Sequence, residues 1–274
     1  MTADTLNSGS SGLSRRWKKP PFIKRPMVRW LLWLGAGIYL ALALGTLEVN
    51  WSRVADGIPR GARFISGFFP PDFTSSWGEI LTGLNESIWM TVTSTVVGIA
   101  ISIPIGLGAA KNLAPKPVYL LCRGILALTR SFHEIIIAIF MVKLFGFGPF
   151  AGFLTLSIAT IGFYGKLLAE DIEDMDPVQA EAVKATGSGW FQWLNYSIQP
   201  QVMPRMIGLG LYRLDINFRE SAVVGIVGAG GIGATLNTAF DRYEFDTAAA
   251  VLLIIIAIVM VVEYTSGYVR QKVQ

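Results

Sequence analysis

A polar stretch decides how this chain is organised. Residues 181–187 read Glu-Ala-Val-Lys-Ala-Thr-Gly, and Pro200 lies 13 residues after the glycine. Alanine and glutamate favour helix, and the closing glycine is placed to end it. Asp176 and Pro177 supply the start, as an acidic cap followed by proline at the first helical position. We therefore predict one short, exposed helix over residues 177–186, followed by a turn.

Long apolar runs surround this stretch. The chain has 274 residues, of which 52% are hydrophobic and only 15% charged, and its mean hydropathy is +0.50. These values exclude an ordinary soluble domain, because the apolar residues come in runs long enough to cross a bilayer. We predict an all-α, polytopic membrane protein with six transmembrane helices. The predicted spans are residues 30–47, 84–109, 118–144, 150–168, 203–227 and 247–268.

Charge at the two ends predicts the orientation. Residues 1–29 are rich in Lys and Arg, and Arg270 and Lys272 follow the last span, so both termini should be cytoplasmic. A twin-arginine export signal at Arg15-Arg16 and a signal peptide cleaved near Ala43 are competing interpretations, and both fit the surrounding residues less well. The predicted parts are a basic tail (1–29), a first span (30–47), an extracytoplasmic segment (48–80) and a core of five spans (81–270) with a cytoplasmic loop (170–204).

The polar stretch also carries a resemblance. Glu181, Ala182, Gly187 and Pro200 match in spacing the cytoplasmic signature of permease subunits of bacterial ABC importers. Val183, Ser197 and Gln199 depart from that signature and leave the helix, the turn glycine and the proline intact. The resemblance implies that this helix docks into a groove of a cytoplasmic ATPase and transmits its closure. The alternative is an ordinary helix in a cytoplasmic loop.

Several charged residues fall inside predicted spans. A charge at membrane depth costs about 2.5–3.5 kcal/mol on insertion scales, so these side chains must face the bundle interior, a water-filled path or one another. Asp215 and Arg219 are spaced i, i+4 and can pair on one helix face. Arg213 and Glu220 need partners elsewhere, for which Glu134 and Arg130 are candidates. Two roles stay open, a translocation path for an anion or the bracing of helices and a dimer seam. The predicted path residues are Arg130, His133, Glu134, Arg213, Asp215, Arg219 and Glu220.

A glycine cluster follows the fifth predicted span. Residues 228–233 read Gly-Ala-Gly-Gly-Ile-Gly, and Gly228, Gly230 and Gly233 satisfy the G-x-G-x-x-G pattern of dinucleotide-binding proteins, with Gly231 as a fourth glycine of the cluster. That pattern needs a strand, a turn and a helix in a soluble unit, and membrane segments on both sides leave no room for a parallel sheet. We interpret the cluster as a close helix approach or an unwound turn, a flexible element or gate at the outer end of the span.

A narrower resemblance covers the chain from about residue 68 onwards. Residues 68–73 (Phe-Phe-Pro-Pro-Asp-Phe), 199–204, 212–219 and 224–233 are similar to the permease subunit of phosphonate importers, a family that also includes phosphite and hypophosphite importers. Residues 131–134 (Ser-Phe-His-Glu) depart from the family pattern, which leaves the exact phosphorus compound open. The glycine run alone is shared with methionine-type importers, which are the alternative.

The resemblance implies a transport subunit rather than an enzyme, in the inner membrane of a bacterium. Its implied partners are a second copy of itself, a dimer of cytoplasmic ATP-binding subunits, an extracytoplasmic substrate-binding protein and the lipid bilayer. Cofactors are expected to be none, since ATP and magnesium would be bound by the partner ATPase. The net charge of +4 does not suggest nucleic acid, and with one Cys and one His a metal site is not expected. The rival classes are an intramembrane enzyme, which would have to use Cys122 and His133, and a passive channel.

Overall fold

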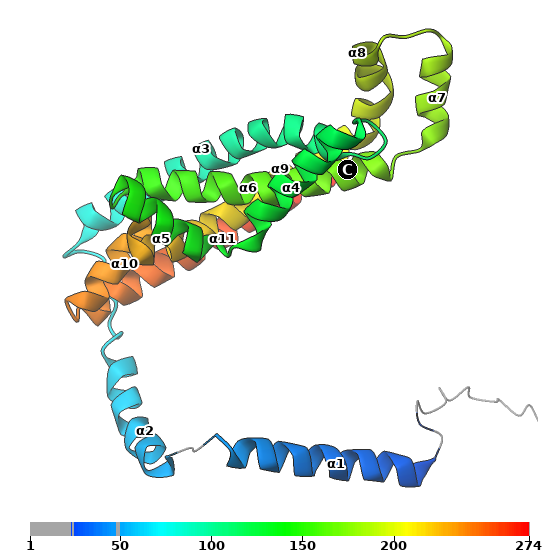
Figure 1. Ribbon diagram of the computed structural model, residues 1–274. Helices are drawn as coiled ribbons and strands as arrows, with labels where there is room; N and C mark the ends of the chain where they lie inside the picture. The colour runs from blue at the N-terminus through cyan, green and yellow to red at the C-terminus, as the bar shows by residue number, and fades with distance from the viewer. Residues whose placement is uncertain (1–22, 24, 48–49, 274) are drawn as a thin grey trace, which may run out of the picture. The chain divides into compact units, whose positions relative to one another are not determined.

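The computed structural model describes residues 23, 25–47 and 50–273 (Figure 1). The regular elements in these ranges are helices, and none of the described residues forms a strand, so the predicted all-α class is confirmed. The chain divides into two units, Met1–Ala62 and Arg63–Gln274, and each is described by itself.

The first unit contains the helix α1 (Pro26–Gly45) and most of α2 (Trp51–Ser66). Proline in its first turn starts α1 slightly earlier than the predicted span. The helix α2 was not predicted. It separates an apolar face, which includes Trp51 and Ile58, from a face that carries arginines. Most of the basic tail predicted for residues 1–29 lies outside the described ranges.

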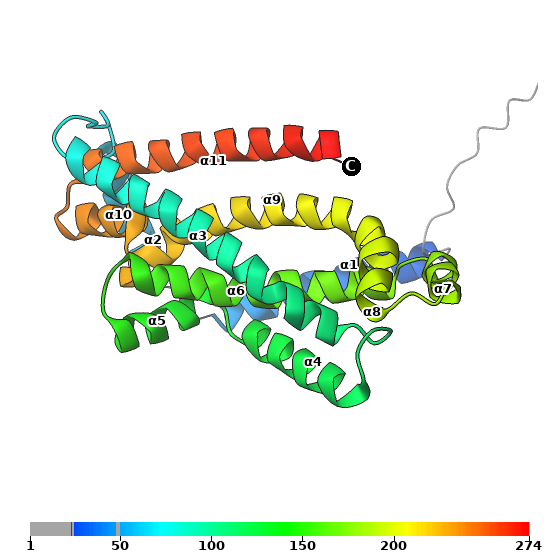
Figure 2. The ribbon, with the colours of Figure 1, turned by 90° about the horizontal axis from the view of Figure 1, so that it is seen from above.

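The second unit is a helical bundle with a small hairpin at one end (Figures 1 and 2). The helices α3 and α6 run beside each other through its length. They approach closely at Gly98, where an added Cβ would come within 2.5 Å of Thr160 Cβ. Its elements in chain order are α3 (Trp77–Ala109), α4 (Lys116–Ser131), α5 (Glu134–Phe145), α6 (Pro149–Glu173), α7 (Pro177–Ala185), α8 (Trp190–Trp193), the π-helix η1 (Leu194–Ile198), α9 (Gln199–Val224), the π-helix η2 (Gly225–Ala229), α10 (Gly231–Asp241) and α11 (Phe245–Val273).

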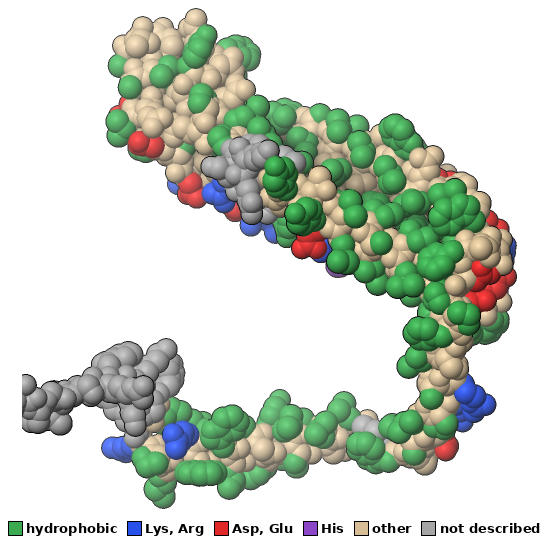
Figure 3. Space-filling view, turned by 180° about the vertical axis from the view of Figure 1, so that it is seen from behind, with side chains coloured by type: hydrophobic (Ala, Val, Ile, Leu, Met, Phe, Trp, Pro, Cys, Tyr) green, Lys and Arg blue, Asp and Glu red, His purple; other side chains and the backbone are tan. Residues whose placement is uncertain are grey.

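The lengths and composition of these helices suit a membrane. Four single helices of the described residues (α1, α3, α6 and α11) are long and apolar enough to cross a bilayer, and two bent pairs bring the total to as many as six. Hydrophobic side chains are spread over the flank of the bundle in Figure 3. An apolar outer surface of this kind is expected where lipid, and not water, surrounds the protein.

One prediction about these spans is wrong. Residues 118–144 do not form one continuous helix, because α4 ends at Ser131 and α5 begins at Glu134 after a bend of 90°. The side chain of His133 accepts a hydrogen bond from the backbone N–H of Ile135 and so caps α5. Glu134 lies in the first turn, where a negative charge is favourable. The polar run at 131–134 was the signal for a new helix start.

The fifth predicted span also differs from expectation. Helical structure runs from Trp190 through η1 and α9 into η2, where Gly228 leaves the helical conformation with a φ of +96°, and α10 follows after a bend of 55°. Pro200 is the second residue of α9 and comes directly after the π-helix η1, where the hydrogen-bond pattern of the helix changes. The polar loop therefore merges directly into the membrane helix.

Candidate functional site

The predicted short helix is present as α7, with the predicted start. The carboxylate of Asp176 accepts a hydrogen bond from Val178 N at 3.0 Å, and Pro177 is the first helical residue. The helix ends in a turn at Gly187, whose φ is +78°. Its N–H donates to Lys184 O at 3.0 Å. The predicted cap, first helical residue and turn glycine are all confirmed.

A second helical segment holds α7 in place. The indole Nε1–H of Trp193 donates to Ala180 O at 2.9 Å, and both residues are buried. Lys184 Nζ lies 4.1 Å from the centroid of the Trp193 ring, and Ser188 Oγ donates to Val183 O at 2.9 Å. Together α7, α8 and η1 form a compact unit, which we call the coupling hairpin (residues 177–198).

The coupling hairpin presents an open surface and is tied to the bundle at its base. Glu181, Ala182 and Gly187 are exposed. At the base, Asp176 N–H donates to the side-chain oxygen of Gln201 at 3.0 Å. Arg205 of α9 pairs with Asp171 of α6 at 3.0 Å. The base of the hairpin is thus bonded to α9, and α9 is in turn paired with α6.

Polar side chains meet in the middle of the bundle. Arg213 is 3% exposed, and its Nε donates to Thr160 Oγ1 at 3.1 Å. Asn217 is fully buried, and its Nδ2 donates to Thr95 Oγ1 at 2.8 Å and to Thr160 Oγ1 at 2.9 Å. This network joins α3, α6 and α9. Sequence reasoning missed Thr95, Thr160 and Asn217, although small hydroxyl residues inside apolar runs are a known signal of contact between membrane helices.

The predicted ion pair between Asp215 and Arg219 is present along α9, which confirms the i, i+4 argument. Asp215 is 4% exposed, while the side chain of Arg219 is 48% exposed. Glu134 of α5 attracts Arg213 of α9, as the sequence suggested, but it repels Glu220 of the same helix because both are acidic.

The predicted path residues therefore differ in burial, with Glu134 and Glu220 half-buried between two clearer groups. Arg213 and Asp215 are buried among neighbouring helices, whereas Arg130, His133 and Arg219 are exposed on the surface of the bundle. Within the described part of the chain, Arg130 has no ion pair with Glu220 or Glu134. Burial favours a bracing role for the first group, and exposure leaves the second group available to a solute or a second subunit.

The glycine cluster forms a packed turn between η2 and α10. Gly228, Gly230 and Gly231 all have positive φ, at +96°, +76° and +73°. An added Cβ on Gly225 would lie 2.7 Å from Gly233 Cα, so the two segments touch through their backbones. Helical neighbours and the lack of any described strand exclude a dinucleotide-binding unit here.

Residues of α3 hold the start of α10, and this was not predicted. Glu86 Oε2 accepts from Gly231 N at 3.0 Å, and Ser87 Oγ accepts from Ile232 N at 2.9 Å. The helix α10 has no side-chain cap of its own, so these two groups satisfy its first N–H groups. On the other side, Gly148 N–H donates to Gly228 O at 3.0 Å. The turn is thus fixed to α3 and to the start of α6.

Comparison with known protein families agrees with this architecture. Residues 102–274 match the model of the binding-protein-dependent transport system inner membrane component. The chain belongs to this family. Its resemblance to permease subunits of ABC importers is therefore confirmed, and it is a multi-pass membrane protein.

Two relatives are similar over most of this chain. The "Phosphate-import permease protein PhnE" of Mycolicibacterium smegmatis is 39% identical over 204 residues, which are 74% of this chain and 38% of that protein. The "Phosphite transport system permease protein PtxC" of Stutzerimonas stutzeri is 36% identical over 229 residues, 83% of this chain and 82% of that one. The chain thus matches well under half the length of the first relative and most of the second.

A solved structure shares the fold. The chain is similar to a protein in the structure titled "Inward facing conformations of the MetNI methionine ABC transporter", with a TM-score of 0.64 and 21% identity. The similarity covers 71% of this chain and 96% of the other. The predicted importer permease fold is confirmed by this likeness.

Proposed function

We propose that the chain is the transmembrane subunit of an ATP-driven importer for phosphonate or a related phosphorus oxyanion, such as phosphite or hypophosphite. The observation that carries the proposal is the compact coupling hairpin at one end of a membrane bundle, in a member of this transport family. The substrate class is supported by the two relatives, which are named as phosphate and phosphite permeases.

In this proposal the coupling hairpin is the contact for a separate ATPase. Glu181 and Ala182 lie on its exposed surface, Gly187 shapes its turn, and Pro200 begins the membrane helix behind it. The ATPase would bind ATP and magnesium, and this chain would hold no cofactor. Closure of the ATPase would move the hairpin, and the base contacts of Asp176 and Asp171 would pass that movement to the bundle.

We place the translocation path between two copies of the chain. Arg130, His133 and Arg219 are cationic or can become so, and their exposure lets them meet an anion at the seam. Glu134 and Glu220, which are half-buried, would keep the path from binding an anion too tightly. Arg213 and Asp215 would brace the helices that carry it.

An extracytoplasmic binding protein would deliver the solute at the other end of the bundle. The turn at Gly228, Gly230, Gly231 and Gly233 would lie close to that entrance and act as part of the outer gate. Basic residues near both ends of the chain support cytoplasmic termini. With the hairpin on the cytoplasmic side, α6 and α9 carry the movement across the membrane.

The test is the ATPase activity of the reconstituted complex of this chain, its ATPase and its binding protein. Methylphosphonate, phosphite, phosphate and methionine would each be titrated. We expect stimulation by phosphorus oxyanions and none by methionine. Stimulation by methionine alone would overturn the substrate class. Solute flux through the chain without its ATPase would instead support a passive channel and overturn the importer.

A further inference from the structure

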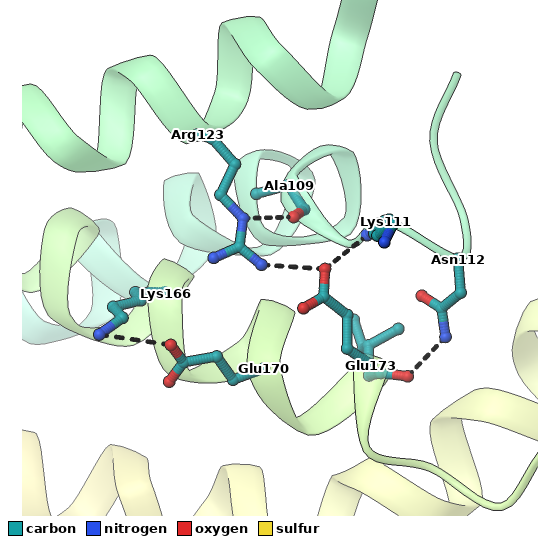
Figure 4. Close-up of polar contacts among 8 residues, drawn as sticks. Ala109, Lys111, Asn112, Arg123, Lys166, Glu170 and Glu173 are labelled. Atoms are coloured by element: carbon teal, nitrogen blue, oxygen red, sulfur yellow. Dashed lines mark hydrogen bonds and ion pairs between the residues drawn. The ribbon is translucent and has the colours of Figure 1, made fainter. Parts of the chain in front are cut away.

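The last residue of α6, Glu173, joins three segments that are distant in sequence (Figure 4). Its Oε1 accepts a hydrogen bond from Lys111 N at 2.7 Å and from Arg123 Nη2 at 2.9 Å. Arg123 also donates through Nε to Ala109 O, the end of α3, at 2.9 Å. We call Glu173, Arg123 and these backbone groups the Glu173 clasp.

The chemistry of the clasp fits the ends of the helices that it joins. A carboxylate at a helix C-terminus is unfavourable because the helix dipole is negative there. Arg123 and the Lys111 N–H compensate for this, and the same guanidinium satisfies a terminal carbonyl of α3. Asn112 adds a hydrogen bond from its side-chain N–H to Ile172 O at 2.8 Å. The ends of α3 and α6 are thus fastened together and to α4.

The clasp differs from an ordinary surface pair that lies beside it. Glu170 pairs with Lys166 at 3.3 Å, but both residues are on α6, so that pair does not connect α6 to another helix. The side chains of Arg123 and Glu173 are 27% and 29% exposed, against 37% and 40% for Lys166 and Glu170. Partial shielding from water makes the clasp the stronger of the two.

The clasp lies directly on the chain path to the coupling hairpin. Glu173 precedes the cap Asp176 and the first residue of α7 by a few positions. Its partner Arg123 lies on α4, and two helical turns further along α4 lies Arg130, a proposed path residue. A path of chain and hydrogen-bond connections therefore runs from the hairpin through Glu173 and Arg123 to the helix that carries Arg130.

We propose that Glu173 is a positioning residue for transport, because its clasp transmits movement of the coupling hairpin to α3 and α4. This inference rests on the proposed function. It assigns the transmission of movement to the carboxylate of Glu173, which lies outside the coupling hairpin. Without the clasp, the hairpin still binds the ATPase and still moves, but α4, which then keeps only its apolar packing on α3 and α6, follows it less closely.

The test compares Glu173→Ala with Glu170→Ala in the reconstituted complex, using methylphosphonate as the solute. We expect Glu173→Ala to lower the solute moved per ATP hydrolysed by about tenfold, a usual size for coupling between sites. Basal ATPase activity should stay unchanged because the docking surface is intact. Glu170→Ala should behave like the unchanged protein. Glu173→Gln keeps an acceptor oxygen and should restore most of the coupling.

A second measurement does not depend on the solute. Hydrogen exchange of the chain in nanodiscs should speed up in residues 110–116 and 174–189 in Glu173→Ala, and not in Glu170→Ala. If both variants moved the same amount of solute per ATP, or had the same hydrogen-exchange rates in these residues, the proposed role of the clasp would be overturned. A complex that no phosphorus compound stimulates would instead remove the proposed function, and hydrogen exchange would still decide whether the clasp holds the hairpin.

Discussion

The two glycine turns of the second unit use glycine for different reasons. At Gly187 the backbone has a φ of +78°, and an added Cβ would meet no atom within 4 Å. At Gly228 and Gly230 the φ values are also positive, but an added Cβ would run into Phe147 and Pro149. Gly233, without positive φ, would place a Cβ against the carbonyl oxygen of Ala222.

Gly187 is therefore required for its backbone torsion alone, whereas the glycines of the turn at residues 228–233 are also required for packing. At Gly187 a side chain would strain the positive φ but meet no neighbour, so a substitution there should change only the conformation of the hairpin turn. At residues 228–233 a side chain would also collide with neighbouring segments, so a substitution there should disturb the packing of the bundle. A substitution at Gly187 should therefore lower transport, and a substitution in the turn at residues 228–233 should lower stability. Variants at the two sites can distinguish these effects.

The largest expected effect is that of Gly233→Ala. The new Cβ would overlap a backbone oxygen, which cannot move aside like a flexible side chain, so we expect a loss of about 3 kcal/mol or more in stability. The measurement is the thermal midpoint of the protein in detergent. Gly210→Ala is the control, since its Cβ would make an ordinary contact with Ile99 at 3.4 Å. Equal midpoints for the two variants would contradict packing at Gly233.

Gly228→Ala should have a smaller effect. Its Cβ would meet the ring of Phe147, but that side chain is 85% exposed and can move. The strain of a positive φ remains, at about 1–3 kcal/mol. Adding Phe147→Ala should restore only the part of the lost stability that comes from the clash with the Phe147 ring. If the double variant regained full thermal stability, torsion would play no part at this position.

Gly187→Val should leave the protein folded and impair transport. Valine resists a positive φ by about 1–2 kcal/mol, a strain confined to the hairpin turn. We expect solute uptake to fall strongly while the thermal midpoint changes little. Gly189→Ala is the matched control, because Gly189 has a φ of −69°. Normal uptake by Gly187→Val would remove the coupling role of this turn.

The smallest expected effect is that of Glu181→Lys. The residue is exposed on the coupling hairpin, and its reversal should weaken binding of the ATPase by about threefold to fivefold, the contribution of one surface ion pair. Gln179→Lys adds a charge to the same helix, so it controls for charge alone. Affinity would be measured by titrating the ATPase onto the chain in nanodiscs. Unchanged affinity in Glu181→Lys would mean that the docking surface lies elsewhere.

Local features were accessible from the sequence because they depend on neighbours in the chain. The cap of Asp176, the proline start and the closing glycine predicted α7 almost to the residue, since each acts within one helical turn. The Asp215–Arg219 pair followed from helical spacing. The apolar runs predicted a membrane bundle, because bilayer thickness sets the length of a span.

Contacts between distant residues were decided only by the tertiary structure. Nothing local shows that Thr160 meets both Arg213 and Asn217, or that Glu173 meets Arg123. These contacts depend on which faces of the helices turn inward, and packing of the whole bundle sets that. The bend between α4 and α5 had a polar signal in the sequence, but its angle of 90° is a property of the fold.

The sequence by itself therefore determined the helical class, the membrane setting and the coupling hairpin, because these depend on composition and on short-range geometry. Only the tertiary structure decided which charges are buried and which are exposed. It also showed that Glu173 fastens the end of α6 to α3 and α4, three residues before the cap of α7. The physical reason is that burial and long-range hydrogen bonds arise from the mutual packing of helices, which no single stretch of sequence encodes.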